Sequence, residues 1–108
     1  MTDSSILEEY ADFVEGKIIT EGEARIVENA LGLAGEVGEV MEKLKKRLRD
    51  GTFNPEEFQK ELGDALFYLV ALHQPFDLLI LNTIRMNMVK LESREERGMI
   101  QGSGDNRW

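Results

Sequence analysis

Four carboxylates stand out because they form two pairs with helical spacing beside apolar residues. Glu36 and Glu39 are three residues apart, as are Glu61 and Asp64, so each pair projects from one side of a helix. Two such groups about 5 Å apart repel each other by about 3 kcal/mol near a protein surface, and a bound cation offsets this repulsion. All-oxygen ligation suits Mg²⁺ or Mn²⁺ and disfavours zinc. The sequence therefore predicts a divalent cation site made of Glu36, Glu39, Glu61 and Asp64.

Spacing alone leaves an alternative open, because the chain holds 21 acidic residues and other acidic pairs, such as Glu92 and Glu95, show the same spacing. Under this alternative hypothesis, each acidic pair is part of a solvated helix face. The whole chain is then a non-enzymatic acidic helical module for oligomerisation or interaction. A di-iron carboxylate protein is excluded, since it needs Glu-x-x-His pairs and the single histidine, His73, follows Val70 at that spacing. The metal site and the interaction module are the two hypotheses that remain.

A strip of glycines borders the first acidic pair. Gly32, Gly35 and Gly38 recur every third residue in a segment whose apolar spacing predicts a helix, although each costs about 1 kcal/mol there relative to alanine. The strip is expected to let another backbone or a flat ligand approach closely.

Composition narrows the function classes. The chain has 108 residues, no cysteine and a net charge of -8. This charge argues against binding to nucleic acid or to an anionic membrane, and the lack of cysteine removes disulfides and thiolate chemistry. The longest apolar run, residues 65–72, is far shorter than the roughly 20 residues that span a bilayer. We expect a single soluble domain over residues 1–108 that acts in the cytoplasm.

Four helices are expected from capping signals and breakers. Ser5 with Glu8 and Thr20 with Glu23 form capping boxes, Asn54-Pro55 is a strong start signal, and Asp77 is a candidate cap after the break at Pro75. The predicted helices cover about residues 5–16, 20–49, 55–73 and 77–97, and residues 98–108 form a glycine-rich, flexible tail.

The apolar pattern predicts how these helices pack. The second helix carries a stripe at the helical period, the third is apolar almost all round and is expected to be buried on most sides, and the fourth is apolar on more than one face. A chain this small cannot bury all of this surface. The predicted fold is an all-α, antiparallel bundle of about four helices that is completed by oligomerisation as a homodimer or homotetramer.

The ordered set of motifs resembles a known family. The segments Asn29-Ala-Leu-Gly-Leu-Ala-Gly-Glu-Val-Gly-Glu39 and Glu61-Leu-Gly-Asp64-Ala-Leu-Phe-Tyr68 are similar to the MazG-type, all-α nucleoside triphosphate pyrophosphohydrolases. The runs 87–94 and 102–107 resemble the C-terminal part of small bacterial and phage members. Together the similarity covers roughly residues 27–107.

The resemblance implies a reaction and a cofactor. It implies Mg²⁺-dependent cleavage of a nucleoside triphosphate between the α and β phosphates, which gives the monophosphate and pyrophosphate, with Mn²⁺ as a substitute ion. By matching positions, Glu36, Glu39, Glu61 and Asp64 would hold the metal, and one of them, with a preference for Glu36, would accept a proton from water. Small phage members favour deoxynucleotides such as dGTP or dCTP, and a phage-encoded protein would act in the host cytoplasm.

The resemblance also points to substrate contacts. Tyr68 is a candidate contact to the sugar, and Asn29 and Asn87 are candidates to hydrogen-bond base or ribose. The cations available for the β and γ phosphates are Lys90, Arg94 and Arg107. The alternative for each of these cations is a solvated charge, and for Tyr68 it is a core aromatic residue.

Overall fold

The computed structural model describes residues 3–98 and the side chains of residues 6–98. The chain divides into two compact units, and the boundary in the sequence lies between Asp77 and Leu78. The first unit contains the helices α1 (Asp3–Lys17), α2 (Gly22–Asp50) and α3 (Pro55–Ala71) and the short 3₁₀ helix η1 (Gln74–Phe76). The second contains α4 (Ile80–Glu96). Residues 3–98 form no strand. The prediction of an all-α fold with four helices is confirmed, and the predictions of one domain and of oligomerisation stay predictions.

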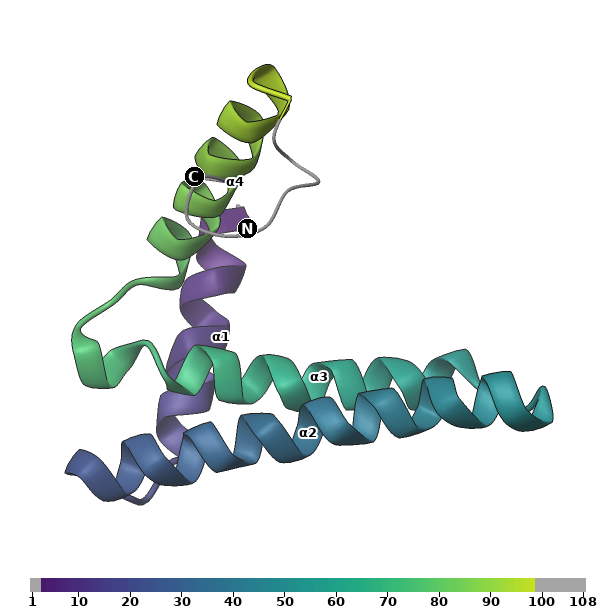
Figure 1. Ribbon diagram of the computed structural model, residues 1–108. Coiled ribbons are helices and arrows are strands. Elements are labelled where there is room, and N and C mark those ends of the chain that lie inside the picture. Colours follow the sequence, from purple (N-terminus) through teal and green to yellow (C-terminus); the bar gives the residue numbers. More distant parts are fainter. Residues whose placement is uncertain (1–2, 99–108) are drawn as a thin grey trace. The chain divides into compact units, whose positions relative to one another are not determined.

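The helices α2 and α3 lie side by side and run antiparallel (Figure 1). The turn between them has the local chemistry that the sequence predicts. Gly51, with φ of 71°, ends α2, and its N–H donates to the carbonyl of Arg47 at 3.0 Å. The Asn54 side-chain oxygen accepts hydrogen bonds from the N–H groups of Glu56 and Glu57 at 2.9 and 3.3 Å, which caps α3. These two caps confine the reversal to a few residues, so α3 must fold back along α2.

Three other predicted helix starts are wrong by a few residues. The chain turns at Gly22, whose φ is 60°, so α2 begins after Thr20, and Glu21 takes the cap position without a side-chain bond. Asp77, with φ of 55°, closes η1 through its N–H, and α4 begins at Ile80. Ser5 lies inside α1 and not at its cap. In each case a residue of capping type is present, but the backbone enters the helix elsewhere.

The face that α2 turns towards α3 mixes polar and apolar residues. The buried residues of α2 are Arg25, Asn29 and Val40. The predicted apolar stripe is left largely exposed, with at least 45% of each of these side chains accessible: Val27, Leu31, Val37, Met41 and Leu48. The expectation that the third helix is buried on most sides is also wrong for the single chain, because only Val70 and Ala71 of α3 are buried. The described chain therefore presents apolar surface on both long helices.

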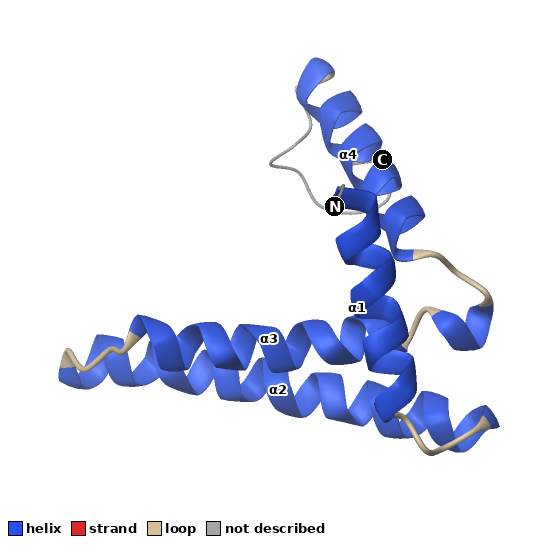
Figure 2. Ribbon diagram, turned by 180° about the vertical axis from the view of Figure 1, so that it is seen from behind, coloured by secondary structure: helices blue, strands red, loops and turns tan. Residues whose placement is uncertain are grey.

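A buried arginine ties the ends of three helices together. The Arg25 guanidinium makes a two-pronged ion pair with the Glu15 carboxylate of α1, and the second prong measures 2.6 Å. The same Nη2 donates to the Ala71 carbonyl at 3.3 Å, which satisfies a backbone acceptor at the C-terminal end of α3. The hydrogen bond from Arg25 lowers the pKa of Glu15. The Arg25 contacts help to hold α1 where it crosses α3 (Figure 2).

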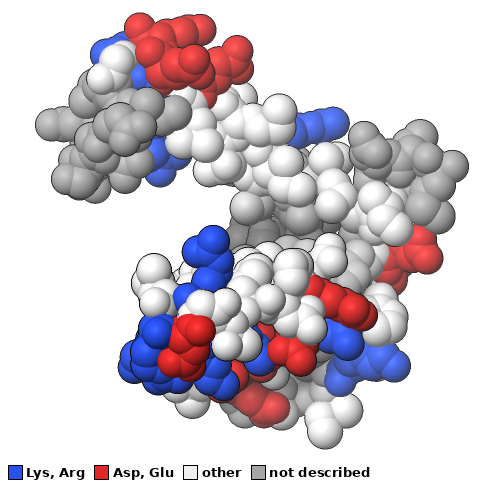
Figure 3. Space-filling view, turned by 90° about the vertical axis from the view of Figure 1, so that its right-hand side faces the viewer, with Lys and Arg blue, Asp and Glu red and all other residues white. Residues whose placement is uncertain are grey.

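Cations and carboxylates lie side by side near the α2–α3 turn (Figure 3). Lys43 of α2 lies 3.6 Å from the Glu57 carboxylate of α3, and Arg49 pairs with the adjacent Asp50 at 2.9 Å. The Arg47 guanidinium lies over the Phe53 ring, 5.6 Å from its centroid. The Lys43–Glu57 pair joins the end of α2 to the start of α3, and the cations of this region lie among carboxylates.

The second unit contains the helix α4, which carries exposed apolar side chains that include Met86, Met88 and Val89. Among residues 3–98, no single helix is both long and apolar enough to cross a membrane. The segments Pro55–Phe76 and Ile80–Glu96 pass that test only when they are counted together as one broken segment.

We predict that Arg25→Ala destabilises the protein by about 2 kcal/mol, because it leaves the Glu15 carboxylate and the Ala71 carbonyl without their buried donor. Urea unfolding followed by circular dichroism measures the change. Arg49→Ala is the matched control, since its ion pair with Asp50 is exposed, and it should change stability by less than about 0.5 kcal/mol. Equal losses in the two variants would show that the Arg25 contacts contribute no more than a surface ion pair.

Candidate active site

Three of the four predicted carboxylates converge between α2 and α3. Glu36 of α2 and Glu61 and Asp64 of α3 each offer an oxygen, and these oxygens all lie within 4.8 Å of one another. Glu36 and Glu61 are half-buried and Asp64 is exposed. The group therefore lies at an accessible surface, where an ion from solution can reach it.

The helix pairing explains this convergence. Glu36 lies on the face of α2 that also carries the buried Asn29 and Val40, seven residues before and four residues after it, so it faces α3. Glu61 and Asp64 are one turn apart on α3, so both carboxylates emerge on the same side. Antiparallel pairing of the two helices brings the single carboxylate against the pair.

Burial and neighbouring carboxylates both act on the pKa of Glu36. Burial raises the pKa of Glu36 above its ordinary value, and the negative charges of Asp64, Glu61 and Glu39 raise it further. A hydrogen bond between the protonated Glu36 and Glu61 acts in the same direction. Without a cation, the site therefore holds a proton more tightly than an isolated glutamate does.

Glu39, the fourth predicted ligand, is not part of this group. It lies one turn beyond Glu36 on α2, its side chain is exposed, and its charge still acts on Glu36. The structure thus brings together three of the predicted ligands and leaves Glu39 at their margin.

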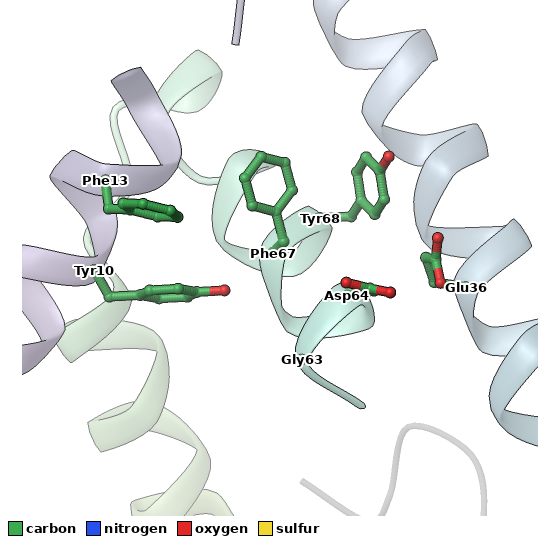
Figure 4. Close-up of a pocket in the computed structure, with 7 residues that line it drawn as sticks. All are labelled: Tyr10, Phe13, Glu36, Gly63, Asp64, Phe67 and Tyr68. Carbon is green, nitrogen blue, oxygen red and sulfur yellow. The ribbon is translucent and has the colours of Figure 1, made fainter. Parts of the chain in front are cut away.

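A cavity of about 450 Å³ opens beside the carboxylates, within the first unit (Figure 4). Its volume lies within the range of small-molecule sites. All three helices of this unit contribute to its lining, which consists of Tyr10, Phe13, Glu36, Gly63, Asp64, Phe67 and Tyr68. The pKa of Tyr10 is raised, first by burial and then by the charge of Asp64. One cavity thus combines carboxylate oxygens with aromatic rings.

Tyr68, predicted to contact the sugar, lines this cavity and packs against the glycine strip. A Cβ atom added to Gly32 would collide with the Tyr68 ring, so only glycine permits this contact. Gly35 and Gly38 have no neighbour within 4 Å of such an atom among the described residues. The close approach that the strip predicts is therefore present at Gly32, where the flat group is a side chain of the protein itself.

Asn29 lies beside a different, smaller cavity. Its side-chain nitrogen donates to the Arg25 carbonyl at 2.8 Å, and the residue is 5% exposed. The cavity of about 150 Å³ that it lines also involves Lys17 and Thr20, and it shares Phe67 and Tyr68 with the larger one. The larger and the smaller cavity are therefore neighbours that share two aromatic residues.

The remaining predicted contacts lie elsewhere in the chain. Asn87, Lys90 and Arg94 belong to α4, in the second unit. Arg107, like the rest of the predicted tail beyond Gly98, lies outside the described residues. The proposed role of these four residues in phosphate or base binding stays a prediction.

Sequence reasoning missed the contribution of α1 and Phe67 to the cavity. Tyr10 and Phe13 have the spacing of an apolar helix stripe, which predicts burial but not a cavity. Phe67 lies in the most apolar segment of α3. Because nothing in the local pattern indicates which helix α1 will meet, no signal in the sequence separates these rings from core residues.

Comparison with known proteins places the chain in a family. Residues 26–99 match the family model described as the MazG nucleotide pyrophosphohydrolase domain. The "Gene 37 protein" of Mycobacterium phage L5 is 45% identical over 82 residues, which cover 71% of this chain and 72% of the phage protein. No solved structure matches the chain. The chain belongs to the MazG nucleotide pyrophosphohydrolase family, whose members are hydrolases of nucleotides.

Proposed function

We propose that the protein is a divalent-cation-dependent hydrolase that converts a nucleoside triphosphate into the monophosphate and pyrophosphate. The observation that carries this proposal is the convergence of Glu36, Glu61 and Asp64 within 4.8 Å, in a family whose hydrolases generally depend on divalent metals. Mg²⁺ is the proposed ion and Mn²⁺ a substitute. Deoxynucleotides such as dGTP and dCTP are the proposed substrates, as the resemblance to small phage members implies.

The residues present fit such an ion. The group offers only carboxylate oxygens, which are the ligands that Mg²⁺ and Mn²⁺ prefer. Its mutual repulsion is relieved by positive charge, and the exposed Asp64 leaves room for phosphate oxygens and water around the ion. We propose Glu39 as a further ligand that lies at the edge of the group.

The reaction needs no covalent nucleophile from the protein. A bound divalent cation would polarise the α-phosphate, acidify an attacking water and neutralise charge on the leaving pyrophosphate. The water oxygen forms a bond to the α-phosphorus, and the bond from that phosphorus to the oxygen bridging to the β-phosphate breaks. We assign the acceptance of the water proton to Glu36, and the positioning of the reactants to Glu61 and Asp64.

The other parts of the substrate have proposed contacts. Tyr68 is next to the carboxylates and is proposed to touch the sugar. Asn29 and Asn87 are proposed to hydrogen-bond base or ribose, and Lys90, Arg94 and Arg107 to neutralise the β and γ phosphates.

A homodimer or homotetramer is part of the proposal. The exposed stripe of α2, from Val27 to Leu48, is long and apolar, and Leu31 is 68% exposed. Monomeric soluble proteins rarely expose continuous apolar surface of this kind. A second copy that covers the stripe would remove it from water.

Asp64→Asn and Glu39→Gln should lower pyrophosphate release by about two orders of magnitude or more, because the amide keeps the shape of the side chain and removes the charge that binds the cation. The melting temperature without metal should stay the same or rise, since one repelling charge is gone. A coupled pyrophosphate assay and thermal denaturation measure the two effects. Glu42→Gln, on an exposed position of α2, is the control that should keep activity. Near-normal turnover in Asp64→Asn or Glu39→Gln would refute the ligand role of that residue.

The raised pKa of Glu36 predicts how stability without metal depends on pH. The folded protein keeps the Glu36 proton above pH 4.5, which is the ordinary pKa at which the unfolded chain loses this proton. This contribution to stability is therefore complete below pH 4.5 and is lost as pH rises through the raised pKa. We therefore expect the free energy of unfolding of Glu36→Gln to rise relative to that of the wild type as pH increases from 4.5 through the raised pKa of Glu36.

Thermal denaturation in EDTA at a series of pH values tests this expectation. The lowered pKa values of Glu15 and Asp50 have the opposite pH dependence but are common to both proteins, so they cancel in the difference. Glu42→Gln should follow the wild type. A constant difference between Glu36→Gln and the wild type across the interval would count against a raised pKa.

Leu31→Glu should convert an oligomer into a smaller species, because it places a charge within the exposed α2 stripe. Light scattering at micromolar concentration measures the molar mass. Ile19→Glu is the control, since Ile19 is 94% exposed, lies outside the stripe and should leave the mass unchanged. A wild-type protein that is a stable monomer would contradict the proposed assembly.

A further inference from the structure

The cavity beside the carboxylates has an aromatic side that the proposed reaction does not use. Tyr10 and Phe13 of α1 form this side, opposite Glu36 of α2 (Figure 4). Their rings are nearly parallel, with centroids 6.2 Å apart and planes inclined by 13°. The Tyr10 hydroxyl points into the cavity, and the edges of both rings face the same way. We call these two residues the aromatic wall.

The aromatic wall presents ring edges to whatever fills the cavity. The Lys17 ammonium lies over the Phe13 ring, 5.2 Å from its centroid, and Tyr10 stacks with Phe13, so the broad faces of Phe13 already have neighbours. Ring edges carry partial positive charge and contact the faces of other aromatic systems favourably. Phe13 is nevertheless 55% exposed, so this edge has apolar surface left to bury. A flat, electron-rich ring is the group that such an edge accommodates.

The cavity offers few polar groups that are free for hydrogen-bond recognition of a base. Among the described residues that line it, the polar side-chain groups are the carboxylates of Glu36 and Asp64 and the hydroxyls of Tyr10 and Tyr68. None of these lining residues carries an amide, ammonium or guanidinium group. The carboxylates belong to the proposed cation site. Contact with aromatic side chains tolerates different bases, because every base has a π-face.

We propose that the aromatic wall of Tyr10 and Phe13 holds the nucleoside part of the substrate by aromatic contact and not by reading the edge of the base. Of the two contacts proposed for Asn29 and Asn87, this leaves the one to the ribose. This inference rests on the proposed function, which places the phosphates at the carboxylates of the same cavity. It makes Tyr10 and Phe13 determinants of nucleoside affinity. It also means that a purine and a pyrimidine nucleotide are accepted with similar affinities.

Calorimetric titration with three compounds separates the nucleoside from the phosphates: inorganic triphosphate and the α,β-imido analogues of dGTP and dCTP, each with Mg²⁺. The wild type should bind both analogues more tightly than triphosphate and with affinities within about tenfold of each other. Phe13→Ala and Tyr10→Ala should each weaken binding of both analogues by about tenfold and leave triphosphate binding unchanged. Tyr10→Phe keeps the ring and should keep the affinity.

Phe76→Ala is the matched control, because Phe76 is as exposed as Phe13, at 55%, and does not line this cavity. It should bind all three compounds like the wild type. Unchanged analogue affinities in Phe13→Ala and Tyr10→Ala would overturn the proposal, as would a hundredfold difference between the two analogues in the wild type. An equal loss in Tyr10→Phe and Tyr10→Ala would assign the effect to the hydroxyl and refute aromatic contact.

The same titrations distinguish a failure of the proposed function. If the wild type binds triphosphate with Mg²⁺ but gains nothing from the nucleoside, the aromatic wall is wrong and the cation site stands. If it binds none of the three compounds, the cation site is wrong and the inference falls with it. Circular dichroism checks the fold of each variant, and the exposed Phe13 decides the matter if Tyr10→Ala does not fold.

Discussion

Antiparallel packing of α2 on α3 is the constraint on which the site depends. It sets Glu36 against Glu61 and Asp64, with oxygens within 4.8 Å of one another. Each pair of charges at this separation costs between about 1 kcal/mol in water and about 3 kcal/mol near a protein surface. Helix packing alone does not explain this cost, because α2 has an apolar face on its other side that would pack against α3 without bringing carboxylates together. Positive charge entering the group would offset this cost, as in the metal-dependent nucleotide hydrolase that we propose.

The same packing links the site to the rest of the chain. Because α2 turns Asn29, Glu36 and Val40 towards α3, its apolar stripe faces outward, where a second copy is proposed to cover it. At the C-terminal end of α3, Arg25 joins α1 to the helix pair through Glu15 and the Ala71 carbonyl. The position of α1 then brings Tyr10 and Phe13 to the cavity. The packing of α2 on α3 and the contacts of Arg25 together therefore set where the aromatic and carboxylate groups meet.

Local signals in the sequence were sufficient for part of this account. Asn54-Pro55 and Gly51 act on neighbouring backbone groups, so the α2–α3 turn is predictable. Helical spacing also picks out Glu36, Glu61 and Asp64 together with Glu39, which the structure leaves at the margin. The rotation of α2 was not predictable, since a periodic stripe does not say whether its partner is α3 or another copy. Nor was the bond from Arg25 to Ala71, which joins residues 46 positions apart.

Electron paramagnetic resonance of Mn²⁺ shows whether Glu36, Glu61 and Asp64 bind a divalent cation. Bound Mn²⁺ loses the sharp signal of the free ion, so titration counts the ions held by the protein without any substrate or turnover. We expect the wild type to bind Mn²⁺ and to release it to excess Mg²⁺, and the combined variant Glu36→Gln, Glu61→Gln and Asp64→Asn to leave the free signal unchanged. Equal Mn²⁺ binding by the wild type and this variant would refute the cation site, because the ion would then be held elsewhere.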